Sequence, residues 1–186
     1  MVIMGLEEDK GDIIINENDL AELVKSIADQ IVKDNKDLSD LVLVGIITNG
    51  VPLAERISHL IQEKTNVSLP VGKLDVGFYR DDILDKGNFI TIQETSIPYD
   101  LTNKTVIIVD DVLHHGRTIR AALDGLVDFG RPNTIRLAVL IDRGQRELPI
   151  QPDYLGQSID ATTSDYVNVS LVEVQAEDFV AIQKKS

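Results

Sequence analysis

The segment Val106-Ile-Ile-Val-Asp-Asp-Val-Leu-His-His-Gly-Arg-Thr118 carries the strongest structural signal in this chain. Its first residues are apolar and β-branched, in a run too short for a core helix and typical of a parallel strand covered on both faces. Two adjacent carboxylates, Asp110 and Asp111, follow at the end of that strand. A turn from Leu113 to Thr118 leads into a helix, whose first backbone N–H groups can bind an anion. Since ligands of α/β sheets bind at the carboxyl ends of strands, the segment predicts a phosphate site.

The two aspartates narrow the class of ligand. Carboxylates above a phosphate site repel a second phosphate, whereas they accept hydrogen bonds from hydroxyl groups. A ribose 5-phosphate suits both the carboxylates and the loop. Its 2′ and 3′ hydroxyls would bind Asp110 and Asp111, and its 5′-phosphate would bind the loop. Gly116 allows the backbone to approach the phosphate closely, and Thr118 adds a hydroxyl donor. The alternative is that the aspartates only cap the end of a strand. The motifs G-x-x-x-x-G-K-[ST] and, after a strand, G-x-G-x-x-G are absent.

The rest of the chain alternates helices and strands. Apolar residues at helical spacing predict a first helix over 16–36. Short apolar runs predict strands at 41–47, 105–109 and 135–141. Helices are expected after the first two strands, one with Pro52 in its first turn and one from Thr118 to Phe129. This order predicts an α/β fold with a mostly parallel sheet flanked by helices.

Three further stretches are less regular. The polar stretch from Tyr79 to Thr105 predicts a long loop or hairpin, and loops of that length are usually functional. The stretch from Pro149 to Asp165 is irregular but too short for a domain linker. After it, alternation at 167–171 predicts a strand, followed by a short terminal helix.

Length and composition bound the class of protein. The 186 residues are 43% hydrophobic and 26% charged, which predicts one globular domain over 1–186. The absence of cysteine excludes a disulfide scaffold and thiol chemistry. The N-terminus lacks the pattern of a secretory signal and no apolar run has the length of a membrane span, so we expect a soluble, cytoplasmic protein. The net charge of −13 disfavours nucleic-acid binding without excluding a local basic patch.

The segment 106–118 resembles the phosphoribosyl diphosphate (PRPP) motif of type I phosphoribosyltransferases. Other stretches resemble, more specifically, the PyrR family of bacterial pyrimidine-operon attenuation regulators, which also act as uracil phosphoribosyltransferases. They are Leu43–Ile46, Tyr79–Asp82, Gly116–Ala122, Leu126–Pro132, Leu137–Gly144 and Arg146–Ile150, and the similarity extends over the chain after about residue 12. The resemblance implies a type I phosphoribosyltransferase fold. Its core would span about 40–145, with a small hood from 12–38 and 146–186 and a long flexible loop near 80–104.

The implied reaction converts uracil and PRPP to UMP and diphosphate, with Mg²⁺ carried on PRPP and not held by protein side chains alone. The resemblance implies that Asp110 and Asp111 hold the ribose, and that Arg80, in a loop closing over the site, completes the catalytic set. It places the diphosphate at the turn 48–50, the 5′-phosphate in the loop and uracil near Asp142. The implied substrate-binding residues are Thr48, Asn49, Gly50, Val112, Leu113, His114, His115, Gly116, Arg117, Thr118, Asp142 and Arg143.

The second implied role is regulation through RNA. UMP in the site would favour binding to the leader mRNA of the pyrimidine operon and so promote termination, and purine nucleotides could oppose it. Arg143 and Arg146 are the candidate RNA contacts, although Arg146 could instead pair with Glu147 or nearby carboxylates. The family resemblance also implies a homodimer or higher homo-oligomer.

The chain departs from the family pattern around the ligand. In the diphosphate turn the family usually carries arginine where this chain has Asn49, and a neutral amide is a weaker partner for a diphosphate. In the phosphate loop, His115 replaces a threonine beside His114. His115 could donate to the phosphate and hold it better when protonated, or the loop backbone alone could bind. Adjacent histidines rarely chelate one metal ion.

Departures on the implied RNA surface all remove basic residues. Asp29 stands where the family carries a histidine, Gln145 replaces another, and Gln151 and Gln157 lie where basic residues are common. Three hypotheses therefore remain: a bifunctional PyrR protein, a PyrR-like enzyme without the RNA role, and a paralogue that binds nucleotide or PRPP with weakened RNA binding and catalysis.

Overall fold

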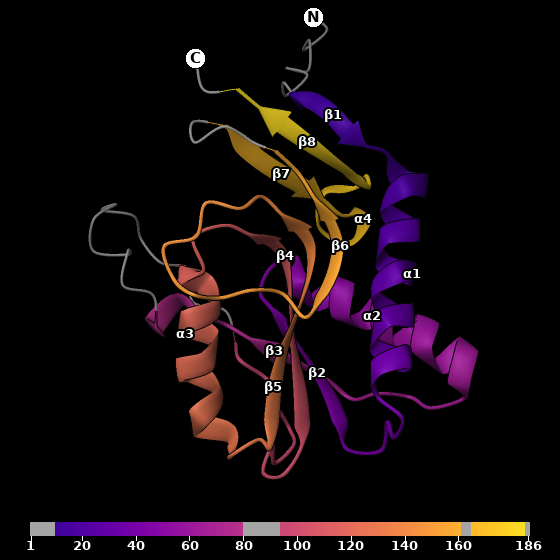
Figure 1. Ribbon diagram of the computed structural model, residues 1–186, viewed down its shortest axis with the longest axis vertical. Coiled ribbons are helices and arrows are strands. Elements are labelled where there is room, and N and C mark those ends of the chain that lie inside the picture. The colour runs from indigo at the N-terminus through magenta and orange to yellow at the C-terminus, as the bar shows by residue number, and fades with distance from the viewer. Residues whose placement is uncertain (1–9, 80–93, 161–164, 185–186) are drawn as a thin grey trace, which may run out of the picture.

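The computed structural model describes residues 10–79, 94–160 and 165–184. Its main element is a five-stranded parallel sheet, seen edge-on at the centre of Figure 1. In spatial order the strands are β3 (Val71–Leu74), β2 (Leu41–Ile46), β4 (Thr105–Leu113), β5 (Thr134–Asp142) and β6 (Tyr154–Ser158). The predicted α/β class with a parallel sheet is confirmed.

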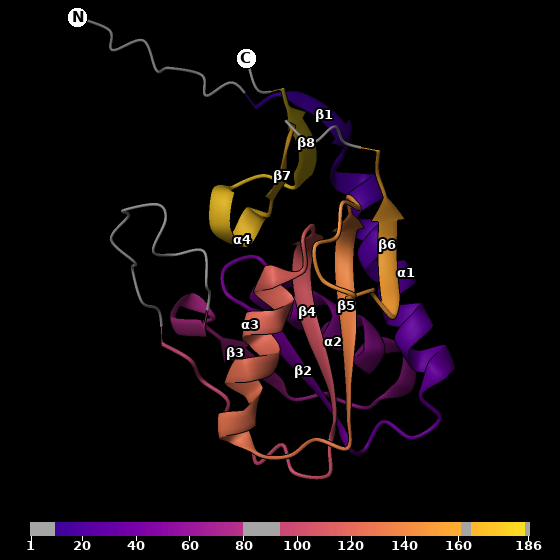
Figure 2. The same ribbon diagram turned by 60° about the vertical axis from the view of Figure 1, so that its left-hand side comes forward.

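Helices cover both faces of this sheet, and Figure 2 shows the sheet turned toward the viewer with helices in front of it and behind it. Two long helices, α1 (Glu17–Asp34) and α2 (Gly50–Thr65), pack on one face. On the other face lies α3 (Arg117–Leu126), which is extended by a 3₁₀ turn, Val127–Phe129. Another 3₁₀ turn spans Gly77–Tyr79. Asn16 caps the start of α1, because its Oδ1 accepts a hydrogen bond from Asp19 N at 3.1 Å.

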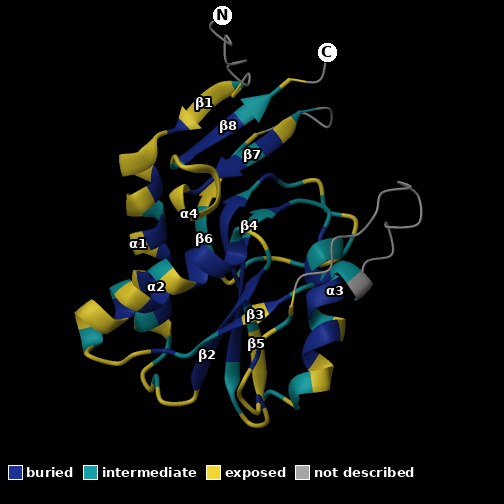
Figure 3. Ribbon diagram, turned by 180° about the vertical axis from the view of Figure 1, so that it is seen from behind, coloured by how far each residue is buried: buried dark blue, intermediate teal, exposed yellow. Residues whose placement is uncertain are grey.

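The two cores explain why the central strands are apolar throughout. Along β4, Ile107 and Val109 belong to the cluster under α1 and α2, whereas Val106 and Ile108 pack under α3. All six residues of β2 are buried in the same way, as the dark blue strands of Figure 3 show. A strand covered on both faces buries every side chain, and this is the pattern that the sequence displays.

A smaller antiparallel sheet sits above the carboxyl ends of the parallel strands. It is formed by β1 (Asp12–Ile15), β8 (Phe179–Gln183) and β7 (Tyr166–Ser170), with the short helix α4 (Val172–Gln175) beside it. Val167, Val169 and Val180 belong to the core cluster under α1 and α2, so this sheet is packed onto the main body. We call it the hood, and it is built from both chain ends as the family resemblance implied.

One arginine ties the hood to α2. Arg56 donates to Glu173 at 2.6 Å and to Asp178 at 2.6 Å, and its side chain is only 21% exposed. The hydrogen bonds from Arg56 hold the pKa of Glu173 below its usual value. Two partly buried ion pairs to one guanidinium are geometrically demanding, so this contact fixes α4 above the start of α2.

The structure corrects three boundaries expected from the sequence. Strand β4 does not end before the aspartates but continues to Leu113, because its last residues pair with the equally long β5. The stretch 149–165, expected to be irregular, contains the edge strand β6. The chain ends in the strand β8 instead of a helix, and the only nearby helix, α4, precedes it in the described residues.

Part of the expected loop near 80–104 lies outside the described residues, since 80–93 and the side chain of Arg80 are not among them. The described end of that loop pairs with the edge of the sheet, where Ser96 and Lys73 exchange backbone hydrogen bonds of 2.9 Å. No helix in the described parts of the chain is long and apolar enough to cross a membrane.

Candidate active site

The acidic pair lies inside β4, where the parallel sheet meets the hood. Asp110 is 7% exposed and lines a pocket with residues 112–119. Its Oδ1 accepts from Asp111 N at 3.0 Å, and Asp111 Oδ1 accepts from Val112 N at 2.7 Å. Backbone donors therefore orient both carboxylates.

The predicted phosphate loop lies beside Asp110 and is shorter than the turn from Leu113 to Thr118 expected from the sequence. Only His114–Gly116 separate β4 from α3. Gly116 caps the helix with φ +93°, a conformation that favours glycine, and its carbonyl accepts the first helical bond from Arg120 N at 3.0 Å. Arg117 and Thr118, the first residues of α3, line the pocket together with Asp110 and the loop residues, so the N-terminus of α3 faces a pocket that suits a phosphate.

The two histidines of the loop are stacked, with ring centroids 3.5 Å apart. His114 Nε2 lies 3.2 Å from Gln145 Oε1. Burial, with help from the nearby charge of Arg143 and from His115, lowers the pKa of His114, although the bond to Gln145 opposes this. His114 is therefore neutral at pH 7 and acts through its backbone and its packing.

His115 faces a carboxylate at the rim of the pocket. Its Nδ1 lies 3.8 Å from Glu147 Oε1, and the same carboxylate accepts from Arg117 Nε at 2.7 Å. Glu147 and Leu148 also donate their backbone N–H groups to the carbonyl of His115. The segment after β5 thus holds the phosphate loop in place, a role for Glu147 that the sequence did not reveal.

The turn 48–50 joins the acidic pair to the hood. Asn49 Nδ2 donates to Asp111 Oδ2 at 2.8 Å and to the carbonyl of Val169, in β7, at 2.9 Å. Gly50 is required by close packing, because a Cβ there would lie 2.3 Å from the carbonyl oxygen of Val109. The turn is therefore pressed directly against β4, next to the ribose site expected from the sequence.

The end of β5 lies beside the phosphate loop, since Asp142 pairs with Leu113 in the sheet. Asp142 Oδ1 accepts from Gly144 N at 2.8 Å, and its Oδ2 accepts from Arg146 Nη2 at 2.6 Å. Arg143 is 7% exposed and donates its backbone N–H to the carbonyl of Leu113 at 3.1 Å. The residues expected to hold uracil thus converge with those expected to hold the phosphate.

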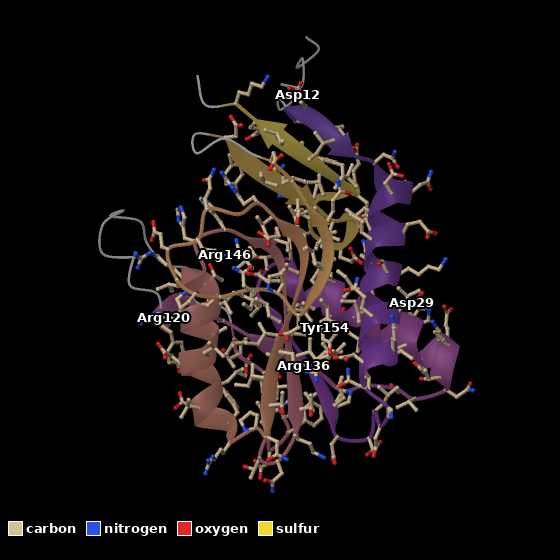
Figure 4. The ribbon with its side chains drawn as sticks, in the orientation of Figure 1. Asp12, Asp29, Arg120, Arg136, Arg146 and Tyr154 are labelled. Atoms are coloured by element: carbon tan, nitrogen blue, oxygen red, sulfur yellow. The ribbon has the colours of Figure 1, made fainter. Side chains whose placement is uncertain are left out.

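Arg146 is engaged inside the protein. Beyond Asp142, its guanidinium donates to the carbonyls of His114, Gly144 and Ile150 at 2.8–3.1 Å, and its side chain is 13% exposed. Figure 4 shows it above α3, within the loops that frame the pocket. These contacts favour the structural alternative for Arg146, with Asp142 as the ion-pair partner. A role in RNA binding stays a prediction.

The face of α1 that carries Asp29 is also acidic in part. Asp29 is exposed, points outward in Figure 4 and pairs with Lys64 of α2 at 2.6 Å. That ion pair engages a cation that could otherwise contact phosphates, and Asp29 itself adds negative charge to this surface.

Fold and site together define a phosphoribosyltransferase-type domain, and comparison with known proteins agrees. The family model described as phosphoribosyl transferase domain matches residues 12–177. Among solved structures, the hypoxanthine phosphoribosyltransferase of Trypanosoma cruzi is similar, with TM-score 0.72, 17% identity and coverage of 96% of this chain and 99% of that one. A hypoxanthine-guanine phosphoribosyltransferase from Bacillus anthracis gives TM-score 0.70, 20% identity and coverage of 91% and 96%. At these identities the likeness shows the fold alone.

Sequence relatives identify the particular family. Bifunctional protein PyrR of Brevibacillus brevis is 46% identical over 172 residues, which is 92% of this chain and 96% of the relative. Bifunctional protein PyrR of Halalkalibacterium halodurans is 45% identical over 94% of this chain and 98% of the relative. The chain belongs to the PyrR family.

Proposed function

We propose that this protein is a PyrR-type regulator of pyrimidine biosynthesis genes that also catalyses the transfer of a phosphoribosyl group from PRPP to uracil. The observation that carries the proposal is the pocket at the start of α3, which Asp110 lines and beside which Asp111 follows in β4. Together with family membership, this pairing of hydroxyl acceptors and a phosphate site fits a 5-phosphoribosyl ligand.

In the proposed reaction the residues of the site mainly position the substrates and stabilise the charge that develops. The 5′-phosphate rests on the amides of 114–118, and the two aspartates accept the ribose hydroxyls. Breakage of the C1′–diphosphate bond builds positive charge on the ribose, and the nearby carboxylates stabilise that charge. Uracil is held at the end of β5, near Asp142 and Arg143. Its ring nitrogen bonds C1′ as the C1′–diphosphate bond breaks, and the proton of that nitrogen is released to water.

Magnesium carried on PRPP fits this site. Asp110 and Asp111 are oxygen ligands of the kind that Mg²⁺ prefers, and backbone donors orient both carboxylates. Bound there, Mg²⁺ would neutralise the leaving diphosphate. Arg80, which the family resemblance adds to the catalytic set, lies outside the described residues.

The proposed regulatory role is UMP-dependent binding to a pyrimidine-operon leader mRNA by a cytoplasmic homodimer or higher homo-oligomer. Against strong RNA binding stand the net charge of −13, the Asp29–Lys64 pair and the internal contacts of Arg146. These observations favour a second candidate, a paralogue that binds the nucleotide with weakened RNA binding and weakened catalysis.

One pair of assays tests the proposal. The first follows UMP formation from uracil and PRPP with Mg²⁺, and the second measures a leader-RNA gel shift with and without UMP. Activity with a UMP-stimulated shift supports the bifunctional protein, and activity without a shift supports an enzyme that has lost the RNA role. Nucleotide binding with little activity or shift supports the paralogue. If the protein binds neither UMP nor PRPP, the proposed function is wrong.

A further inference from the structure

Asn49 has an unusual set of hydrogen bonds for the residue before a helix. It stands at the N-cap of α2, yet its side chain does not cap that helix. Asparagine is favoured at this position because its side-chain oxygen normally accepts from the first turn. Here the side chain instead crosses to β4 and β7, where it bonds Asp111 Oδ2 and the carbonyl of Val169.

Both of these partners are acceptors, which fixes the orientation of the amide. With the amide reversed, its oxygen would face a carboxylate and a carbonyl, and both contacts would become repulsive. A primary amide has two N–H donors, and Asn49 uses one on Asp111 and the other on Val169. No donor of this side chain then remains for a second ligand unless one of these bonds breaks.

The amide therefore links three parts of the site. It joins the turn before α2 to the Asp111 carboxylate, which we assign to the ribose, and to the hood strand β7. Its partner in β7 is Val169, a residue that is 3% exposed. Because Val169 is part of the core, its carbonyl is a fixed acceptor and holds Asn49 in one rotamer. Asp111 Oδ2 is in turn held by Asn49, while its Oδ1 is held by Val112 N.

We propose that Asn49 is a positioning and specificity-determining residue that preorganises Asp111 for a ribose and biases the site toward nucleoside 5′-monophosphates over PRPP. The inference rests on the proposed function and deepens it. A monophosphate needs only Asp110, Asp111 and the pocket at α3, all of which are in place without a free donor at residue 49. The diphosphate of PRPP adds negative charge near the turn, where the side chain of Asn49 offers only its carbonyl oxygen, an acceptor that cannot bond the phosphate oxygens.

Substitution by arginine tests this most directly. A guanidinium carries five N–H donors, so an arginine at 49 can still satisfy Asp111 and Val169 and keep donors for a diphosphate. Since a charge-assisted hydrogen bond changes an equilibrium constant by roughly tenfold or more, Asn49→Arg should tighten PRPP–Mg²⁺ binding by about tenfold. Binding of UMP should change by less than about twofold to threefold, because its contacts remain.

The experiment is titration calorimetry of UMP and of PRPP–Mg²⁺ with the full chain and three variants. Asn49→Ala should weaken UMP binding about threefold to tenfold, since Asp111 loses a fixing bond, and should give no gain for PRPP. Asn18→Arg, an exposed position of α1, makes the same chemical change far from the site and should alter neither affinity. Thermal unfolding confirms that each variant is folded.

The ratio of the two affinities decides the result. A rise in the preference for PRPP in Asn49→Arg, with UMP affinity lost in Asn49→Ala, supports the inference. An unchanged ratio in Asn49→Arg, or unchanged UMP affinity in Asn49→Ala, overturns it while the proposed function stands. If the wild-type chain binds neither ligand, the proposed function itself fails.

Discussion

Asn49 and Asp111 lie in segments 62 residues apart and share a hydrogen bond of 2.8 Å from the amide to the carboxylate. The bond connects the turn before α2 to the strand that carries the acidic pair. The same amide reaches the hood through Val169. Asn49 and His115 are the two residues near the expected ligand that depart from the family pattern. Asn49 is hydrogen-bonded inside the site, whereas His115 lies at the rim of the pocket beside Glu147.

Replacement of the aspartates tests the ribose assignment. Asp110→Asn and Asp111→Asn each exchange an anionic acceptor for a neutral amide of the same shape. Each variant should therefore weaken UMP binding by about tenfold, the value of one charge-assisted hydrogen bond. Titration calorimetry with UMP measures this, and Asp124→Asn, on the exposed face of α3, is the matched control. Unchanged affinity in both site variants would remove the ribose from these carboxylates.

Gly50 should tolerate no side chain. In Gly50→Ala the new Cβ would meet the Val109 carbonyl, so α2 or β4 must shift, at a cost of about 1–3 kcal/mol in the free energy of unfolding. Urea denaturation measures that loss. Gly144→Ala is an informative comparison, since no atom lies within 4 Å of a Cβ there and only its φ of +71° opposes the change. Equal stability of Gly50→Ala and the wild type would show that the turn is not packed as described.

We expect Arg146 to contribute more to the stability of the fold than to RNA binding. Arg146→Gln removes the ion pair with Asp142 and most of the donors to the three carbonyls around the pocket. The loss should lower the free energy of unfolding by about 2–4 kcal/mol, because buried partners remain unsatisfied. Denaturant unfolding tests this with Arg131→Gln, an exposed arginine, as control. A fully stable Arg146→Gln that loses only leader-RNA binding would instead assign Arg146 to the RNA surface.

Acid should weaken the phosphate loop through His114. Burial lowers the pKa of His114 in the folded state, so below about pH 6.5 the unfolded chain binds a proton that the folded chain does not. Stability therefore falls as the pH drops through that value, and at higher pH His114 makes no contribution of this kind. Unfolding free energies of wild type and His114→Gln between pH 5 and 8 measure it. The variant should show a shallower loss than the wild type, and an equally steep loss would contradict the role of His114.

The sequence predicted the central part of the fold because the signals for those elements lie within short, continuous stretches of sequence. Apolar runs such as 41–47 and 105–109 can only be covered strands, and the segment 106–118 combines a strand, carboxylates and a glycine loop in one place. The edge strand β6 was missed since its residues are half exposed and lack that pattern. The strand pairing of β1 with β8 depends on residues near opposite ends of the chain, and no local signal reports it.

The sequence supplied the candidate site residues but not the contacts among them. The positions of Asp110 and Gly116 follow from the motif, whereas the bond from Asn49 to Val169 uses a main-chain carbonyl, which carries no residue identity. Likewise, Glu147 was expected near Arg146 but its carboxylate pairs with Arg117 across the loop. Contacts of this kind depend on how two distant loops meet, and this is set only by the packed fold.

The most direct measurement is a crystal structure of the protein with UMP. The ribose hydroxyls should lie within hydrogen-bond distance of Asp110 and Asp111, and the 5′-phosphate should occupy the pocket lined by residues 112–119 at the start of α3. A nucleotide bound elsewhere, with that pocket empty, would contradict it.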